Sequence, residues 1–139
     1  MDKVQPVVLI VDDEPSVRRM LKEMFTSEDM TVITANDTTT ALELLTANQP
    51  DLIVTDLMLP QVGGAAFIQQ VRTIERFSKT PIIVLSGFTS GLGPTARAAG
   101  ATLLLRKPDD ILTLVESAKK LIEKGEEEVE KGDPSNTIS

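Results

Sequence analysis

Polar residues with reactive or metal-binding side chains follow four short apolar runs of this chain. In chain order they are Asp12 and Asp13, then Asp56, then Ser86, and then Lys107. If the apolar runs are parallel strands, their carboxyl ends meet at one edge of a sheet, which is where open parallel sheets bind ligands. The spacing therefore predicts that these five side chains share one pocket.

Three carboxylates in one pocket repel one another unless a divalent cation neutralises them. Magnesium suits such a site, since it takes few protein oxygens and keeps water or phosphate oxygens in its octahedron. Lys107 adds a positive charge and Ser86 a hydrogen-bond donor. Together these groups favour in-line attack by the Asp56 carboxylate on phosphorus, which would form an aspartyl phosphate.

The composition narrows the chemistry further. Among 139 residues there is no cysteine and no histidine. Disulfides, zinc–thiolate sites, thiol nucleophiles and Ser-His-Asp triads are therefore excluded, as is a phosphohistidine on this chain. The remaining oxygen ligands favour magnesium, manganese or calcium.

Charge and hydropathy indicate where the protein acts. The net charge is −7, and residues 125–139 contribute five acids against one base. With no basic stripe and four phenylalanines as the only aromatic residues, nucleic acid is not an expected partner. The first apolar run, 7–11, is too short for a secretory or membrane-spanning segment. We expect a cytoplasmic protein that does not bind membranes.

Apolar runs alternate with helical patterns along the chain, which is typical of an α/β fold with a parallel sheet. We expect one folded domain over residues 1–124, followed by an acidic, disordered tail or linker over 125–139. The runs are rich in β-branched residues and apolar throughout, as strands buried on both faces are. The predicted strands are 7–11, 31–35, 52–55, 82–85 and 102–105.

Helices are predicted between the strands from apolar residues at helical spacing. In the first helix these are Val17, Met20, Leu21, Met24 and Phe25, and in the last they are Ile111, Leu114, Val115, Ala118, Leu121 and Ile122. Residues that favour a helix start precede or begin these patterns. Pro15 suits the first turn of the first helix, and Asp37 or Thr38 could cap the second helix. Gly64 precedes the third helix, and Asp109 or Asp110 could cap the last one.

The fourth helix has the weakest signal. Glycines at 91 and 93 and a proline at 94 leave only 95–99 as a clear helical stretch. Because glycine adds backbone freedom, we expect the segment 87–93 to be a loop that changes conformation.

Each polar residue also has an ordinary structural interpretation. The pair Asp12-Asp13 is common in solvated turns, Ser86-Gly87 is frequent in turns, and Lys107 before a proline suits a surface loop. The functional interpretation depends on the order of these residues along the chain, because each of them stands at the end of a successive apolar run.

In that order the residues resemble the receiver domain of two-component response regulators, over residues 6–124. The resemblance is carried by the motifs at 11–15 and 51–56, the loop residues Leu59-Pro60 and Gly63-Gly64, and the pairs Ser86-Gly87 and Lys107-Pro108. It implies a flavodoxin-like five-stranded sheet in the order 2-1-3-4-5, with helices on both faces. It also implies that a histidine kinase or histidine phosphotransfer protein phosphorylates Asp56.

The resemblance further implies a role for each site residue. Asp13, Asp56 and the backbone carbonyl of Met58 would bind Mg²⁺ directly, and Asp12 would act through water. Ser86 and Lys107 would hold the phosphoryl oxygens. The Lys107–Pro108 peptide bond would be cis.

Three departures from the family pattern affect the expected behaviour. Leu104 stands where the family often has a tyrosine or phenylalanine switch residue, so the usual serine-to-aromatic coupling is absent. Met58 and Phe88 stand where the family gates the hydrolytic water, and these bulky apolar residues suggest slow autodephosphorylation. The glycine-rich fourth helix suggests that phosphorylation orders residues 87–99.

We therefore expect a phosphorylation switch and not an enzyme, apart from self-phosphorylation by small phosphodonors. The surface formed by the fourth helix, the fifth strand and the fifth helix would signal to a protein partner. The protein would be a monomer or a phosphorylation-dependent dimer. The domain could stand alone or belong to a longer protein. Arg18, Arg19 and Lys22 could meet an acidic kinase surface or form a solvated face.

Two other functions are open. A degenerate receiver would serve only as an interaction module. A magnesium-dependent phosphohydrolase of the haloacid dehalogenase kind also uses an aspartate nucleophile, but it is expected to have Asp-x-Asp spacing on the first strand and a cap for the substrate.

Overall fold

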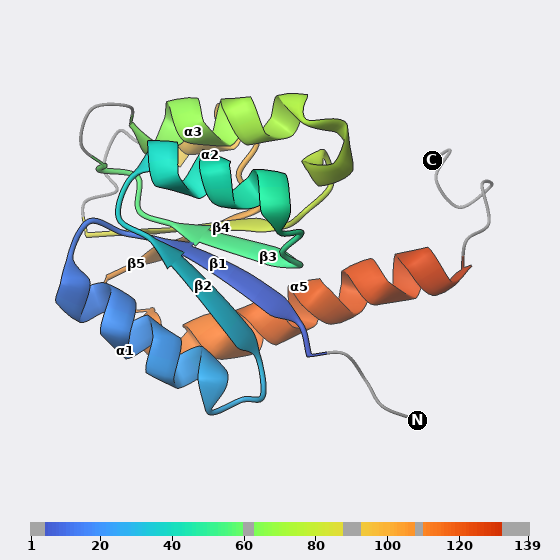
Figure 1. The fold of residues 1–139 in the computed structure, drawn as a ribbon. Coiled ribbons are helices and arrows are strands. Elements are labelled where there is room, and N and C mark those ends of the chain that lie inside the picture. The colour runs from blue at the N-terminus through green and yellow to red at the C-terminus, as the bar shows by residue number, and fades with distance from the viewer. Residues whose placement is uncertain (1–4, 60–62, 88–92, 108–109, 132–139) are drawn as a thin grey trace.

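The computed structural model describes residues 5–59, 63–87, 93–107 and 110–131, and for residues 93 and 126–131 it describes only the backbone. Five parallel strands form one sheet in the order β2-β1-β3-β4-β5, with helices on both faces (Figure 1). The predicted flavodoxin-like fold is therefore confirmed.

The elements alternate along the chain as predicted. The strands are β1 (Val7–Val11), β2 (Thr31–Ala35), β3 (Leu52–Thr55), β4 (Ile82–Ser86) and β5 (Leu103–Arg106). The helices are α1 (Pro15–Thr26), α2 (Thr38–Ala47), α3 (Gly64–Thr73), α4 (Gly93–Ala99) and α5 (Ile111–Lys131), with a short 3₁₀ helix, η1 (Glu75–Phe77), after α3.

Both faces of the sheet are buried, which explains why the strand sequences are apolar throughout. Helices α1 and α5 cover one face, and α2 and α3 lie on the other (Figure 1). Successive residues of β1 alternate between two separate cores: Val8 and Ile10 pack with Leu21 and Phe25 of α1, whereas Leu9 packs on the opposite side. This alternation follows from the two-residue repeat of a strand.

Local signals set most helix starts as expected. Pro15 is the first residue of α1, where its missing N–H is not needed. Asp37 caps α2, and its Oδ1 accepts the backbone N–H of Thr40 at 2.8 Å. Hydrogen bonds from Thr40 lower the pKa of Asp37 below its ordinary value of 3.8. Asp110 precedes α5, and its carboxylate accepts the backbone N–H of Arg106 at 2.9 Å.

Several boundaries differ from the sequence-based expectation. Ser86 is the last residue of β4 instead of following it, and β5 starts and ends one residue later than predicted. Gly64 is the first residue of α3 instead of preceding it. Helix α5 continues through Gly125 to Lys131, so the predicted boundary at 124 falls inside a helix. The division at 124 into domain and tail stays a prediction, and residues 132–139 lie outside the described part.

The short helix α4 ends at Ala99, and the next residue, Gly100, has a φ of +117°, which suits glycine. The N–H of Gly100 donates to the carbonyls of Ala96 and Arg97, which closes the helix. The predicted mobile loop at 87–93 lies largely outside the described residues, so its behaviour stays a prediction.

A guanidinium group from α3 secures this end of α4. Arg72 donates to the carbonyl of Gly100 through Nε at 3.1 Å and through a second nitrogen at 2.9 Å. We call Arg72 and its acceptors the Arg72 cluster; the other acceptors are the carbonyls of Phe77, Ser78 and Thr80 and the hydroxyl of Thr102. Burial lowers the pKa of Arg72 from its ordinary value. The cluster joins the connections that lead into β4 and β5.

Candidate functional site

Asp12 follows β1 and is bound by its neighbours on several sides. Its backbone N–H donates to the carbonyl of Ala35 at 3.1 Å. Its Oδ1 accepts the backbone N–H of Glu14 at 2.9 Å, which fixes the turn into α1. Only 2% of the residue is exposed. A carboxylate buried this far is costly unless it is hydrogen-bonded and paired with a cation.

Asp56 follows β3, directly beside Asp12 across the sheet. Its backbone N–H donates to the carbonyl of Val11 at 3.0 Å, which continues the pairing of β1 and β3. Its Oδ1 accepts the backbone N–H of Met58 at 2.9 Å. The residue is 7% exposed, so its carboxylate lies at the base of the site and not on its rim.

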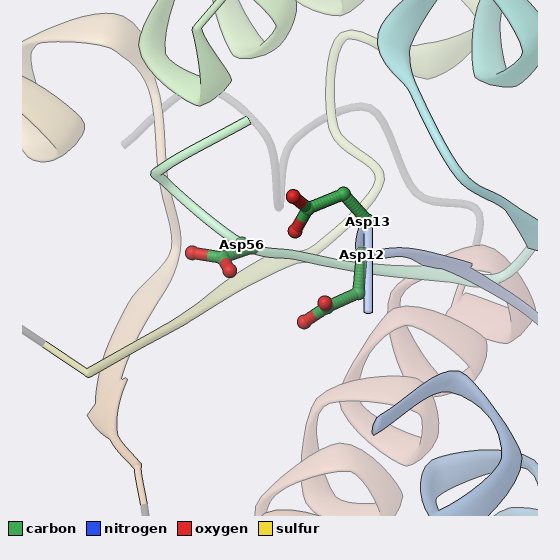
Figure 2. A group of neighbouring side chains, drawn as sticks. All are labelled: Asp12, Asp13 and Asp56. Atoms are coloured by element: carbon green, nitrogen blue, oxygen red, sulfur yellow. The ribbon is translucent and has the colours of Figure 1, made fainter. Parts of the chain in front are cut away.

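The three predicted carboxylates lie together. One oxygen atom from each of Asp12, Asp13 and Asp56 lies within 4.8 Å of the other two. Figure 2 shows the three side chains around a common space, with Asp12 and Asp13 on neighbouring positions and Asp56 opposite. Asp13 is exposed, unlike the other two. Hard oxygen donors at this separation fit a small divalent cation such as Mg²⁺.

Lys107 reaches this cluster from the end of β5. Its Nζ lies 2.8 Å from Oδ2 of Asp12 and 3.2 Å from Oδ2 of Asp56. Burial alone would lower the pKa of Lys107, but hydrogen bonds to Asp12 and Asp56 and their negative charges outweigh it and raise the pKa. The ammonium form, and any stability it adds, therefore persists below the ordinary pKa of 10.5 and is lost only as the pH rises through the higher folded value.

Ser86 joins the same edge of the sheet. It is fully buried at the end of β4, and its carbonyl accepts the backbone N–H of Lys107 at 2.9 Å. This bond sets the ends of β4 and β5 side by side. All four strand ends named by the sequence therefore contribute to one site.

The other residues singled out from the sequence lie around this site or outside the described part. Met58, two residues after Asp56, is 59% exposed. Leu104 is partly buried and packs against the core on the α2 and α3 side of the sheet. Phe88 and Pro108 lie outside the described residues, so the water gate at Phe88 and the cis peptide bond stay predictions.

Sequence reasoning missed the contact that Arg18 makes at the site. Arg18, considered above as a surface residue for docking, is half-buried, and its Nη1 donates to the carbonyl oxygen of Asp12 at 2.6 Å. Arg19 and Lys22 are exposed, as a docking surface or a solvated face requires. No sequence motif separates Arg18 from Arg19, because only the path of the turn decides which one faces Asp12.

A family model described as the response regulator receiver domain matches residues 8–119. The chain belongs to this family. Receiver domains act in two-component signalling, interact with histidine kinases and downstream effectors, bind Mg²⁺ in an acidic pocket, and are generally not enzymes. The predicted family is therefore confirmed, and a phosphohydrolase of the haloacid dehalogenase kind is not favoured.

Curated relatives show the same domain within longer proteins. The sensor histidine kinase TmoS of Ectopseudomonas mendocina is 43% identical over 82 residues, which cover 59% of this chain and 8% of the kinase. The regulator of RpoS from Escherichia coli K12 is 35% identical over 103 residues, which cover 73% of this chain and 30% of that protein. The chain thus spans less than a third of the length of these relatives.

Solved structures agree with the fold. The chemotaxis response regulator CheY4 of Vibrio cholerae is 31% identical with a TM-score of 0.79, covering 85% of this chain and 99% of CheY4. A receiver domain of the Pseudomonas aeruginosa sensor histidine kinase PA1611, with a magnesium ion coordinated in its active site cleft, has a TM-score of 0.79 at 24% identity, covering 86% of this chain and 99% of that one. At that identity the second likeness supports the fold alone. Within the described residues, no helix is long and apolar enough to cross a membrane.

Proposed function

We propose that this domain is a phospho-accepting receiver of a two-component phosphorelay, in which Asp56 takes a phosphoryl group from a histidine kinase or a histidine phosphotransfer protein. The observation that carries the proposal is the meeting of Asp12, Asp13 and Asp56 within 4.8 Å, with the Lys107 ammonium 3.2 Å from Asp56. A degenerate receiver would not need three carboxylates gathered around one ammonium group, because a cluster with excess negative charge is typical of a site that binds a cation or carries out chemistry.

Asp13, Asp56 and the backbone carbonyl of Met58 would hold Mg²⁺ directly, with Asp12 acting through water. The donor set fits, since all its atoms are hard oxygens and the carboxylates outnumber the single ammonium. When bound, Mg²⁺ would supply positive charge to the phosphoryl oxygens.

The residues of the chain would carry the transfer itself. A carboxylate oxygen of Asp56 forms the new bond to phosphorus while the bond from phosphorus to the donor's imidazole nitrogen breaks, and that nitrogen keeps the electron pair. The N–H of Met58 holds Oδ1 of Asp56 and so orients the carboxylate. Lys107 and Ser86 would hold phosphoryl oxygens as charge builds on them.

Phosphorylation would add about −1.5 to −2 charges at this edge of the sheet. Because Leu104 has no hydroxyl or aromatic ring, the signal would pass through the backbone joining Ser86 and Lys107 to α4, β5 and α5, and this surface would bind a downstream protein partner. Whether the phosphorylated form is a monomer or a dimer would depend on that surface.

Intact mass spectrometry tests the proposal directly. The protein is incubated with a small phosphodonor such as phosphoramidate, with Mg²⁺ or with a chelator. We expect one phosphoryl adduct that depends on Mg²⁺ and is absent from Asp56→Asn. Asp51→Asn is the matched control, since Asp51 lies at the opposite end of β3 and accepts the N–H of Val7. No adduct on the wild type, or an equal adduct on Asp56→Asn, would contradict the proposal.

Slow loss of the phosphoryl group is a further part of this proposal. The apolar side chain of Met58, next to Asp56, offers no hydrogen bond to an attacking water. Met58→Asn should therefore shorten the lifetime of the adduct in the same mass assay. An already short lifetime that Met58→Asn leaves unchanged would argue against this role.

A further inference from the structure

The peptide group between Asp12 and Asp13 has a side-chain partner of its own. Nη1 of Arg18, one turn into α1, lies 2.6 Å from the carbonyl oxygen of Asp12. Because a peptide group is planar, fixing this carbonyl also fixes the direction in which the chain enters Asp13. Arg18 therefore acts on a group that joins two of the three site carboxylates.

Asp12 itself needs little further support. Its N–H donates to Ala35, its Oδ1 accepts from Glu14, and its Oδ2 accepts from Lys107. With the bond from Arg18 to its carbonyl, every polar atom of Asp12 is engaged. These hydrogen bonds hold Asp12 in place, directly before Asp13 in the chain.

Asp13 differs in this respect. It is exposed, and its carboxylate accepts no hydrogen bond from the residues that the structure describes. The direction of its side chain therefore depends on its backbone, and the peptide group before it is the one that Arg18 holds. Loss of that bond would widen the range of positions open to the Asp13 carboxylate.

We propose that Arg18 is a positioning residue for the cation site, acting through the Asp12–Asp13 peptide group. This inference rests on the proposed function, in which Asp13 binds Mg²⁺ directly. The neighbouring Arg19 carries the same charge on the same helix but is exposed and makes no such bond within the described residues. It is therefore a matched control.

Charge and positioning predict opposite effects, which makes the proposal testable. If Arg18 acted only as a positive charge near the site, its removal would strengthen Mg²⁺ binding, because like charges repel. If Arg18 positions Asp13, its removal would weaken binding. Residues that orient a metal ligand typically change metal affinity by about 10–100-fold.

The experiment is a titration of the ¹⁵N-labelled protein with MgCl₂ alone, followed by amide NMR shifts at constant ionic strength. We expect Arg18→Met to weaken Mg²⁺ binding about tenfold. Arg18→Lys keeps the positive charge and a nitrogen that can donate a hydrogen bond, so it should recover part of the affinity. Arg19→Met should leave it unchanged or slightly stronger.

A second readout separates metal binding from chemistry. In the phosphodonor assay, Arg18→Met should need about tenfold more Mg²⁺ for its half-maximal rate and should reach the wild-type rate at saturating Mg²⁺. If Arg18→Met does not fold, Arg18→Gln against Arg19→Gln gives the same comparison.

The outcomes distinguish this inference from the function on which it rests. Wild-type protein that binds Mg²⁺ while Arg18→Met binds it equally well or more tightly would overturn the positioning role alone. A wild-type domain that binds no Mg²⁺ would overturn the proposed function and the positioning role together. Weaker binding in Arg18→Met with partial rescue by Arg18→Lys would support both.

Discussion

The acidic site and the Arg72 cluster are two concentrations of polar groups at opposite edges of the same sheet. The acidic site lies at the carboxyl ends of β1, β3, β4 and β5, and the Arg72 cluster lies where the chain enters β4 and β5. Both are partly buried and both contain a charged group. They differ in how that charge is balanced.

In the acidic site, three carboxylates meet one ammonium group, so negative charge is in excess. In the Arg72 cluster, one guanidinium donates to four carbonyl groups and a hydroxyl, with no carboxylate among the described residues near enough for an ion pair. Each nitrogen of the guanidinium therefore donates to at least one neutral oxygen. An added cation would complete the first arrangement, whereas the second is complete and serves the fold.

The largest expected effect comes from removing the arginine. Arg72→Met leaves several carbonyls without their donor, and we expect a loss of about 3 kcal/mol in the free energy of unfolding, measured with urea. Arg76→Met is the matched control, because Arg76 is exposed and, among the described residues, donates to a single carbonyl, that of Leu45. Arg76→Met should lower the free energy of unfolding by about 1 kcal/mol.

Affinity for Mg²⁺ should not change in Arg72→Met, because the cluster lies at the far edge of the sheet. If Arg72→Met loses no more stability than Arg76→Met, the Arg72 cluster does not have the structural role that distinguishes it from the acidic site. A large change in Mg²⁺ affinity would show that the two regions are coupled.

Two glycines, one in each region, sharpen the comparison. A Cβ on Gly64 would lie 2.5 Å from the Asp56 carbonyl oxygen and 2.7 Å from Cα of Leu57, so the backbone beside Asp56 would have to move. A Cβ on Gly100 would lie 2.9 Å from Cγ of Arg72, at a φ of +117°. Each alanine variant should cost about 2 kcal/mol of stability.

The two variants should separate in Mg²⁺ titrations. Gly64→Ala should also weaken Mg²⁺ binding, because it displaces the segment that carries Asp56, whereas Gly100→Ala should not. Equal Mg²⁺ affinities for both variants would mean that the β3–α3 turn absorbs the added methyl group without moving Asp56.

Neutralising one carboxylate of the acidic site should raise the free energy of unfolding, whereas the variants above lower it. Asp13→Asn removes an exposed negative charge within 4.8 Å of two others, so urea unfolding in the presence of a chelator should show a gain of about 1 kcal/mol. The stabilisation that Mg²⁺ gives the wild type should disappear in this variant. If Asp13→Asn is less stable than the wild type, repulsion among the three carboxylates does not lower the stability of the fold.

The smallest effect tests a carboxylate that belongs to neither region. Hydrogen bonds from Thr40 depress the pKa of Asp37, so its stabilising effect is present above the ordinary value of 3.8 and is lost as the pH falls through the lower folded value. Asp37→Asn keeps a capping oxygen without this titration. Urea unfolding from about pH 5 to pH 3 should therefore show a slightly shallower decline than in the wild type.

Much of the fold could be predicted because its signals are local. The runs that become β1, β2 and β3 have their observed bounds, and Pro15 and Asp37 start their helices as expected. The end of α5 was harder, since Gly125 weakens a helix by only about 1 kcal/mol relative to alanine and the helix continues past it to Lys131.

The candidate site was predictable for the same kind of reason. Asp12, Asp56, Ser86 and Lys107 each interrupt or follow a strongly apolar strand, so a parallel sheet brings them to one edge. Arg72 and Arg18 had no comparable signal. Each looks like an ordinary helix arginine, and its acceptors are backbone carbonyls, which no side-chain pattern reveals.

The sequence by itself determined the order of strands and helices, the burial of both sheet faces and the group of polar residues at the strand ends, because residue type and spacing along the chain encode these features. Only the tertiary structure decided which oxygens Lys107 contacts, that Arg18 and not Arg19 meets the Asp12 carbonyl, and that Arg72 secures Gly100. These contacts depend on the path of turns and on the packing of distant segments, and a few tenths of an ångström there decide whether a hydrogen bond forms.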